Sequence, residues 1–401
     1  MRFFEPLTAL REKLFTRLYV AQAISLLGDS ITWLGIALLA YEFGGDKSAK
    51  ILAVSLVLRV SAFVIFGSYA GIIADNFSRK KIMIITNMFR MIIVFSLAFV
   101  TAAWQLYALI FLLNIFNAFF SPAYKACIPQ LVSRKENYGN AIALSNATWQ
   151  LLGIIGPGMA GILAVAWGAR QIFFVDAFSF LASSALILFI PISLVSNEVS
   201  KSSLSFASTW NDMKAGTKLV FGNAPIRFSI FIELAAALAG AQIMVNTIGH
   251  IKGDMMLSDD EFGFIMAAFG AGATIAAFTS STIDRSRTKA RLLTSGAIML
   301  GVAVASANFV SFEVLTFLWI VAGLGLSFAD MPSQILIAEN IKLDQQGKAY
   351  GSHFAWTHVW WATGYTLAGI TGTYFRNYDF VAGGALCIIF LTVLLLFKYR
   401  K

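Results

Sequence analysis

The chain has 401 residues, of which 58% are hydrophobic and only 13% are charged. Soluble domains average about 45–50% apolar and about 25% charged residues, so the composition excludes an ordinary soluble domain and predicts an all-α polytopic membrane protein. The net charge of +9 does not indicate a nucleic-acid partner, because the basic residues gather in loops between apolar segments.

The chain begins with a basic arm and continues as a series of apolar windows. The first fifteen residues lack the short apolar core and cleavage site of a secretory signal, so we expect a retained cytoplasmic arm. A membrane-spanning helix needs roughly 20 apolar residues, and the chain length accommodates about twelve such helices. They are predicted near residues 17–42, 51–74, 82–103, 105–124, 140–167, 171–192, 226–249, 262–283, 291–310, 314–338, 350–373 and 379–397.

A polar, Ser- and Lys-rich stretch divides these windows into two sets of six. This arrangement predicts two helical halves joined by a linker. The expected domains are residues 1–192 for an N-terminal six-helix half with its arm, 193–223 for a cytoplasmic linker, and 224–401 for a C-terminal six-helix half.

The distribution of basic residues predicts the orientation in the membrane. Of the 30 Lys and Arg residues, 23 fall in the termini and loops of one side, and five fall in loops of the other. Because Lys and Arg accumulate in cytoplasmic loops, we expect a multi-pass protein of the inner (plasma) membrane with both termini in the cytoplasm. The five residues on the external side are Lys47, Lys50, Arg170, Lys252 and Arg376.

The connection between the second and third predicted helices carries a distinctive motif of Gly71, Asp75, Arg79 and Lys80. Glycine lets helix ends approach closely, and the acid can pair with a base beyond the turn. The motif resembles the corresponding loop of the major facilitator superfamily. We interpret it as a cytoplasmic gating latch, whose contacts matter only if they differ between two states. In the second half, Asp284 stands where Asp75 stands in the first, as an internal repeat predicts.

A second motif lies in the fifth predicted helix and contains Gly156, Pro157 and Gly161. It is similar to the antiporter motif of drug exporters in this superfamily, and so favours export. Proline bends the helix and the glycines permit close helix contacts. A plain small-residue packing face is the alternative reading.

Three further stretches resemble the macrolide-efflux and enterobactin-exporter branch of the superfamily. The resemblance implies twelve transmembrane helices in two pseudo-symmetric six-helix bundles that transport a solute. The stretches are Ser25–Asp29, Ser121–Ala123 and Asp176–Phe180.

Charged side chains inside predicted spans are costly and are therefore candidate functional residues. Asp29, midway along the first helix, is the leading site for a proton or a cation. A structural pairing of this carboxylate, with Arg59 as a candidate partner, is the alternative. Asp330 in the tenth helix and Glu233 in the seventh are the next candidates.

The eleventh predicted helix begins with a group of aromatic residues. Trp356 and Trp360 share a helix face at i, i+4 spacing, and His358 between them is a group that can titrate. These residues could stack on a flat or cationic substrate, although ordinary packing explains them equally well.

Together these features predict a secondary active transporter that exports an amphipathic organic compound, such as a drug or a macrolide-like molecule, in exchange for protons. An exporter of a siderophore, a lysophospholipid or a metal is the alternative within transport. A non-transporting membrane receptor is the alternative outside it. The expected partners are the small-molecule substrate, protons and membrane lipid, and we expect a monomer.

Enzymatic activity is not expected. The three histidines show no catalytic spacing, there is no phosphate-binding loop, and Cys127 and Cys387 indicate neither a metal site nor a disulfide. We therefore expect no cofactor and no metal.

Overall fold

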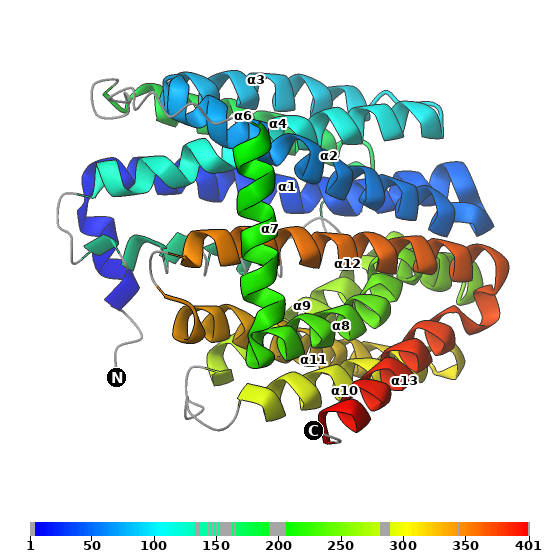
Figure 1. Cartoon of the computed structure of the whole chain (residues 1–401). Helices are drawn as coiled ribbons and strands as arrows, with labels where there is room; N and C mark the ends of the chain where they lie inside the picture. Colours follow the sequence, from blue (N-terminus) through cyan, green and yellow to red (C-terminus); the bar gives the residue numbers. More distant parts are fainter. Residues whose placement is uncertain are drawn as a thin grey trace. The chain divides into compact units, whose positions relative to one another are not determined.

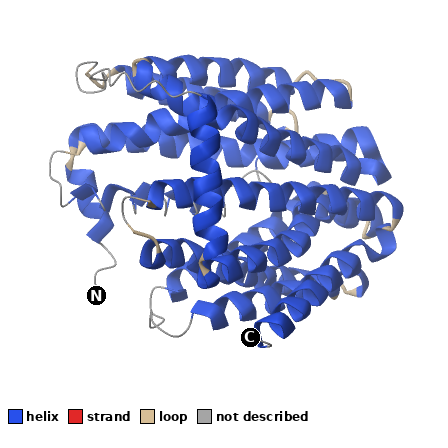
Figure 2. Ribbon diagram, in the orientation of Figure 1, coloured by secondary structure: helices blue, strands red, loops and turns tan. Residues whose placement is uncertain are grey.

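The structure is a computed structural model of the chain. It describes residues 5–132, 137–138, 140–142, 144–145, 148–149, 151–152, 163, 166–191, 206–280, 289–342 and 345–399. All regular structure in these residues is helical, and no strand occurs among them (Figure 2). The predicted all-α class is therefore confirmed.

The helices follow the predicted apolar windows closely (Figure 1). In the first half they are η1 (Glu5–Arg11), α1 (Lys13–Gly44), η2 (Gly45–Lys47), α2 (Ser48–Asn76), α3 (Arg79–Leu97), α4 (Ala103–Leu131) and α6 (Ile172–Leu188). The second half contains α7 (Phe206–Gly222), α8 (Ala224–Gly249), the π-helix η4 (His250–Asp254), α9 (Asp259–Ser280), α10 (Lys289–Ala305), η5 (Ala307–Phe309), α11 (Phe312–Asn340), α12 (Gln346–Tyr374), η6 (Arg376–Tyr378) and α13 (Asp379–Tyr399). Most of the predicted helix at 140–167 lies outside the described residues.

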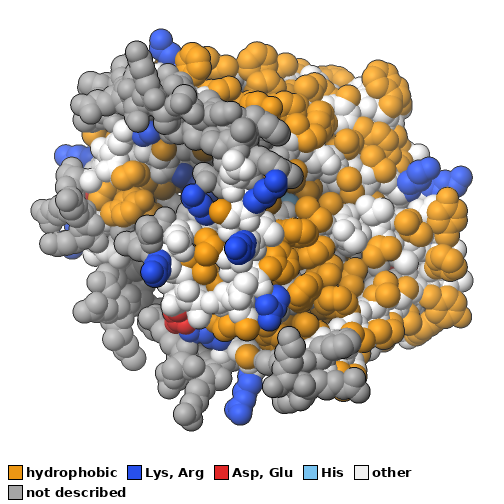
Figure 3. All heavy atoms as spheres, viewed as in Figure 1, with side chains coloured by type: hydrophobic (Ala, Val, Ile, Leu, Met, Phe, Trp, Pro, Cys, Tyr) orange, Lys and Arg blue, Asp and Glu red, His pale blue; other side chains and the backbone are white. Residues whose placement is uncertain are grey.

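Several of these helices are long and apolar enough to cross a membrane. Hydrophobic side chains cover much of the face shown in Figure 3, as expected for contact with lipid. Among the described residues, the segments that satisfy both criteria are Lys13–Gly67, Ala103–Leu131, Ala224–Asp254, Lys289–Phe309, Phe312–Asn340 and Arg376–Leu396.

The chain divides into two compact units. The first comprises residues 1–39 and 61–203, and the second comprises residues 40–60 and 204–401. The hairpin tip formed by the end of α1, η2 and the start of α2 therefore packs with the second unit, although it lies far from that unit in sequence.

Small residues explain how the hairpin tip packs against α12. A Cβ atom built on Gly372 would lie 2.6 Å from Ala49 Cβ, and one built on Gly369 would lie 2.5 Å from Ala53 Cβ. Only glycine on α12 leaves room for this approach, which is how membrane helices commonly pack closely.

Within the first unit, α3 packs against both α4 and α6. In the second unit α8 contacts α10, α11, α12 and α13, and 78% of its apolar window is buried. Most of α8 is therefore enclosed by protein.

The predicted linker contains a helix of its own, α7, which docks on α12. Gly216 lies against the Lys348 carbonyl, and Thr217 Oγ1 is 2.9 Å from Ser352 Oγ. The Phe221 and Trp356 rings meet edge to face at 5.2 Å. Basic side chains gather on the face of the molecule where α7 lies (Figures 1 and 3).

Candidate functional site

The first unit contains a buried ion pair between Arg90 of α3 and Asp29 of α1. Arg90 Nη2 donates to Asp29 Oδ2 at 2.7 Å, and Arg90 Nη1 donates to Asn87 Oδ1 at 2.9 Å. The guanidinium also lies 4.0 Å from the centre of the Phe180 ring, within cation–π range. Arg90 is only 2% exposed, so its charge depends on these contacts.

Asp176 of α6 completes this network. Its carboxylate accepts hydrogen bonds from Thr32 Oγ1 at 2.5 Å and from Ser179 Oγ at 2.9 Å. It also interacts electrostatically with Asp29 and Arg90. Two carboxylates thus share one guanidinium, and the group of three carries one negative charge when both acids are ionised.

The second unit contains an acid–base group on α8, α11 and α12. Glu233 Oε1 and His353 Nε2 are 3.0 Å apart, and both side chains are almost fully buried. The Gln334 amide nitrogen lies 3.5 Å from the other ring nitrogen, His353 Nδ1. Glu233 Oε2 has no hydrogen-bond partner among the described residues.

Asp330 of α11 adds a second carboxylate to this group. It interacts electrostatically with both Glu233 and His353, and its side chain is exposed. The group therefore combines a buried acid–base pair with a second carboxylate that is close enough to interact with both of its members.

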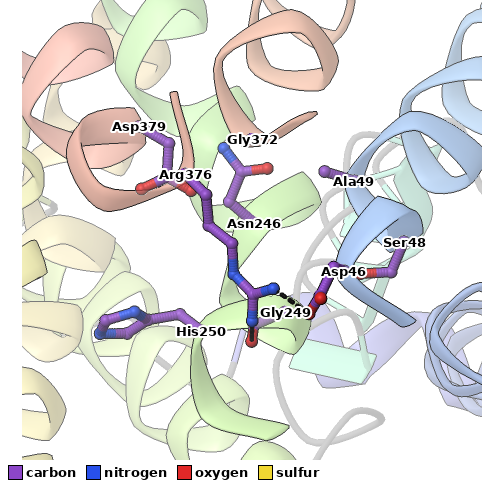
Figure 4. A pocket seen from close by; sticks show the side chains of 9 residues that line it. All are labelled: Asp46, Ser48, Ala49, Asn246, Gly249, His250, Gly372, Arg376 and Asp379. Atoms are coloured by element: carbon purple, nitrogen blue, oxygen red, sulfur yellow. Dashed lines mark hydrogen bonds and ion pairs between the residues drawn. The ribbon is translucent and has the colours of Figure 1, made fainter. Parts of the chain in front are cut away.

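A third polar group lies at the helix ends that the charge distribution predicts to be external. Arg376 of η6 lies between the hairpin tip and the end of α8 (Figure 4). It forms an ion pair with Asp46 of η2, contacts Asp254 Oδ1 through Nε at 2.8 Å and donates to the Gly249 carbonyl at 3.1 Å. His250 Nδ1 lies 2.9 Å from the other Asp254 oxygen.

These residues surround a small hollow of about 10 Å³, which is room for about one water molecule. Asp379, at the start of α13, accepts hydrogen bonds from the Phe380 backbone and from Asn308 Nδ2 at 2.7 and 2.9 Å. The pocket is lined by Asp46, Ser48, Ala49, Asn246, Gly249, His250, Gly372, Arg376 and Asp379 (Figure 4).

In the predicted gating loop, the basic side chains contact helix ends. Arg79 Nη1 donates to the Ala126 carbonyl at 3.0 Å, and Lys80 Nζ donates to the Leu188 and Ile190 carbonyls at 2.7 and 2.5 Å. Lys80 thereby binds the carbonyl end of α6, where a cation is favoured.

Other predicted motif residues lie outside the part of the structure that is described, so their roles stay predictions. They are the surroundings of Gly71, the Asp75 side chain, Asp284, and the motif of Gly156, Pro157 and Gly161.

The aromatic residues of α12 divide into two environments. The Trp356 ring lies tilted against that of Trp360, with 5.3 Å between ring centres, and its indole nitrogen donates to Thr217 Oγ1 of α7 at 3.3 Å. This contact gives Trp356 a packing role in the docking of α7. His358 interacts electrostatically with Arg59, and its Nδ1 lies 2.8 Å from the Phe354 carbonyl.

Sequence reasoning did not select His353, His250 or Arg376. The available signals were a histidine inside an apolar span and, for Arg376, a basic residue on the side where few occur. Among the described residues no cluster of three or more His, Cys, Asp or Glu side chains has the arrangement of metal ligands.

Comparisons with known proteins agree with the sequence resemblance. The family described as "transmembrane secretion effector", of the major facilitator superfamily, matches residues 4–342. The MFS-type transporter YfiS of Bacillus subtilis is 26% identical over 87% of this chain and 84% of its own length. Macrolide efflux protein A of Streptococcus pyogenes is 21% identical over 84% of each chain.

Solved structures share the fold. The nucleoside transporter NupG superposes with a TM-score of 0.72 at 17% identity, and the match covers 97% of this chain and 100% of that one. The predicted resemblance to the drug and macrolide-efflux branch is confirmed. The chain is thus a multi-pass membrane transporter and belongs to the transmembrane secretion effector family of the major facilitator superfamily.

Proposed function

We propose that this transporter exports amphipathic organic compounds, of the drug or macrolide-like kind, in exchange for protons. It works by alternating access between two six-helix halves in the plasma membrane, with both termini in the cytoplasm. Support for export comes from a relative named a macrolide efflux protein and from the Gly156–Pro157 motif. The charge distribution supports the orientation.

The observation that carries proton coupling is the Glu233–His353 pair beside Asp330. Charged groups inside a membrane protein are retained for function. Asp29 is already committed to an ion pair with Arg90 at 2.7 Å. Glu233 instead faces a base that can itself gain or lose a proton, and it has an unpartnered oxygen among the described residues.

The charge balance of this group suggests how it couples the transport of protons to the transport of substrate. An ionised Glu233 and a protonated His353 neutralise each other, which leaves the negative charge of Asp330. Either a proton or a cationic substrate can neutralise that charge, but not both at once. A proton from outside therefore displaces the substrate, and substrate binding from the cytoplasm displaces the proton. Such competition shifts the population of the two transport states.

The proposal is tested in proteoliposomes that contain the purified transporter, with ethidium and erythromycin as probe substrates and an imposed pH gradient. Asp330→Asn and Glu233→Gln remove one ionisable carboxylate each and should abolish transport driven by the pH gradient. Exchange of labelled for unlabelled substrate without a gradient should survive in Glu233→Gln, because that step needs no net proton transfer.

The matched control is Glu313→Gln in the first turn of α11, since this acid is at the helix end. It should transport like the unmodified chain. Gradient-driven transport that persists in both Asp330→Asn and Glu233→Gln contradicts the proposed coupling site. Absence of transport for every probe and gradient contradicts the exporter function itself.

A further inference from the structure

Helix α2 carries a cation, Arg59, within an apolar part of its sequence. In the eight positions before it, Ile51–Leu58, the sequence has seven apolar residues and Ser55. A guanidinium stays protonated inside proteins, so this positive charge is permanent. Charged side chains within membrane-spanning segments are rare and usually mark a binding or transport site. Arg59 is therefore a candidate for contact with a substrate.

Arg59 lies at a depth where transporters bind their substrates. It is eleven residues beyond Ser48, the first residue of α2 at the end predicted to be external, which corresponds to roughly 17 Å along a helix. The hydrocarbon core of a bilayer is about 30 Å thick, so Arg59 is close to the middle of it. Substrate sites of secondary transporters are typically found at that level.

Three ring-bearing side chains of α12 form a stripe near Arg59. His358 and Tyr365 both interact electrostatically with its guanidinium. Trp361 is three residues after His358 and four before Tyr365, so the three side chains share one face of the helix. The ring centres of Trp361 and Tyr365 are 5.4 Å apart, and all four residues are half-buried. We call these four residues the Arg59 group.

Glycines on two sides of α12 position this stripe. A Cβ atom at Gly369, one turn from Tyr365, would lie 2.5 Å from Ala53 Cβ, so α12 packs closely on α2 there. A Cβ atom at Gly240 of α8 would lie 3.0 Å from the Trp361 ring, so the missing side chain leaves room for the indole. The Arg59 group thus belongs to parts of α2 and α12 that pack together in the second unit.

The chemistry of the Arg59 group suits an oxyanion on a flat ring system. A guanidinium presents several N–H donors in one plane and binds both oxygens of a carboxylate at once. A tyrosine hydroxyl can donate a further hydrogen bond. The rings of Trp361 and Tyr365 offer apolar surfaces on which an aromatic molecule stacks. A carboxylate attached to an aromatic ring matches all of these features.

We propose that the Arg59 group binds the acidic group of the exported compound. This inference rests on the proposed function and narrows its substrate class. The Glu233–His353 pair and Asp330 receive the basic end of the substrate, and the Arg59 group receives its acidic end. His353 and His358 are five residues apart on α12, roughly 8 Å along the helix, so one drug-sized molecule can reach both. The transporter therefore favours flat amphoteric compounds, which carry an amine and a carboxylate.

Norfloxacin and its methyl ester test the proposal, because the two molecules differ only at the acidic group. Norfloxacin is a flat quinolone with an amine and a carboxylate, and the ester keeps the ring system and the amine. Binding of each to the purified full-length transporter in nanodiscs is measured through the fluorescence of the quinolone. The unmodified chain should bind norfloxacin about tenfold or more tightly than the ester, as expected for a charge-assisted hydrogen bond.

Arg59→Gln should make the two affinities nearly equal, by weakening the binding of norfloxacin alone. Ethidium, which is cationic and has no acid, should bind this variant as it binds the unmodified chain. Trp361→Leu should weaken norfloxacin and the ester alike, since ring stacking does not depend on the acid. The matched control is Lys50→Gln, which removes an exposed positive charge from the same helix and should keep the preference for the acid.

Arg59→Lys is the second variant, because Arg59→Gln can disturb the fold as well as the site. Lysine keeps the positive charge but lacks the planar fork that binds both carboxylate oxygens. The preference for norfloxacin over the ester should therefore fall several-fold in Arg59→Lys, while the binding of ethidium stays.

The proposal is overturned if the unmodified chain binds the ester as tightly as norfloxacin. It is also overturned if the preference for the acid survives in Arg59→Gln or is unchanged in Arg59→Lys. Loss of every probe in both variants would assign Arg59 to the stability of the fold, and would overturn the proposal as well. Transport of ethidium by the unmodified chain reports on the exporter function separately, so the two failures are distinguishable.

Discussion

The buried charge of Arg90 is neutralised by specific acidic partners. The positive charge of Arg90 lies close to the carboxylates of both Asp29 and Asp176. Its guanidinium also packs over the Phe180 ring. Breaking a buried ion pair by removing one partner leaves the other charge uncompensated, which costs about 3–5 kcal/mol. The network is therefore a structural element first, and Asp29 belongs to it.

Arg90→Gln tests this balance at the scale of one residue. It should lower the free energy of unfolding by about 3–5 kcal/mol, because the Asp29 carboxylate loses its cation. The change is measured as loss of thermal stability in the purified protein.

Arg90→Gln combined with Asp29→Asn should recover part of this loss, since no unpaired charge remains. If the double variant is as unstable as the sum of the two single variants, the pair does not act as a unit.

At the scale of the helix, the sequence predicts most elements well. About twenty apolar residues in a row form a strong local signal, and α2, predicted at 51–74, runs from Ser48 to Asn76. Helix α7 was not predicted, because a helix of 17 residues inside a polar stretch is too short for the same signal. Its docking on α12 depends on residues more than a hundred positions away.

The candidate sites were less predictable than the helices. Composition selects Asp29, Glu233 and Asp330, because a charge in an apolar run stands out. The partners Arg90 and His353 depend on how each helix is rotated and packed, and the sequence of one helix does not contain that information. The polar group around Arg376 could not be predicted for the same reason, since it joins four separate segments.

Gly216→Val tests the docking of α7. A Cβ atom at this position would collide with the Lys348 carbonyl, so α7 should detach from α12. Trypsin should then cleave after Lys214 and Lys218 several-fold faster than in the unmodified protein, because local unfolding exposes the backbone. Gly222→Val is the matched control on the same helix, since a Cβ there meets nothing within 4 Å. Equal cleavage of the two variants would show that α7 is not held through Gly216.

At the scale of the whole molecule, the main feature is that the α1–α2 hairpin is divided between the two units. Residues 1–39 and 61–203 form the first unit, whereas residues 40–60 pack with the second. The tip is held by buried apolar side chains such as Leu52 and Leu56, by the close approach of Ala49 and Ala53 to glycines of α12, and by an ion pair whose acid is exposed. Exposed ion pairs contribute little, about 0–1 kcal/mol, so the Arg376–Asp46 pair adds little to this attachment beside the packed side chains.

Gly372→Val should weaken that attachment. The added Cβ would meet both Ala49 and the Asn246 side chain, and forcing extra atoms into a packed contact costs about 1–3 kcal/mol. Amide hydrogen exchange in residues 40–60 should become faster, while exchange in the first unit's α3 should stay unchanged.

Gly351→Val on the same helix is the control, because a Cβ at Gly351 meets nothing within 4 Å while the change in helix propensity is the same. Faster exchange in both variants would assign the effect to α12 itself. Faster exchange in Gly372→Val alone would assign it to the hairpin contact. In that case the packing of Ala49 against Gly372 limits local opening of the hairpin tip.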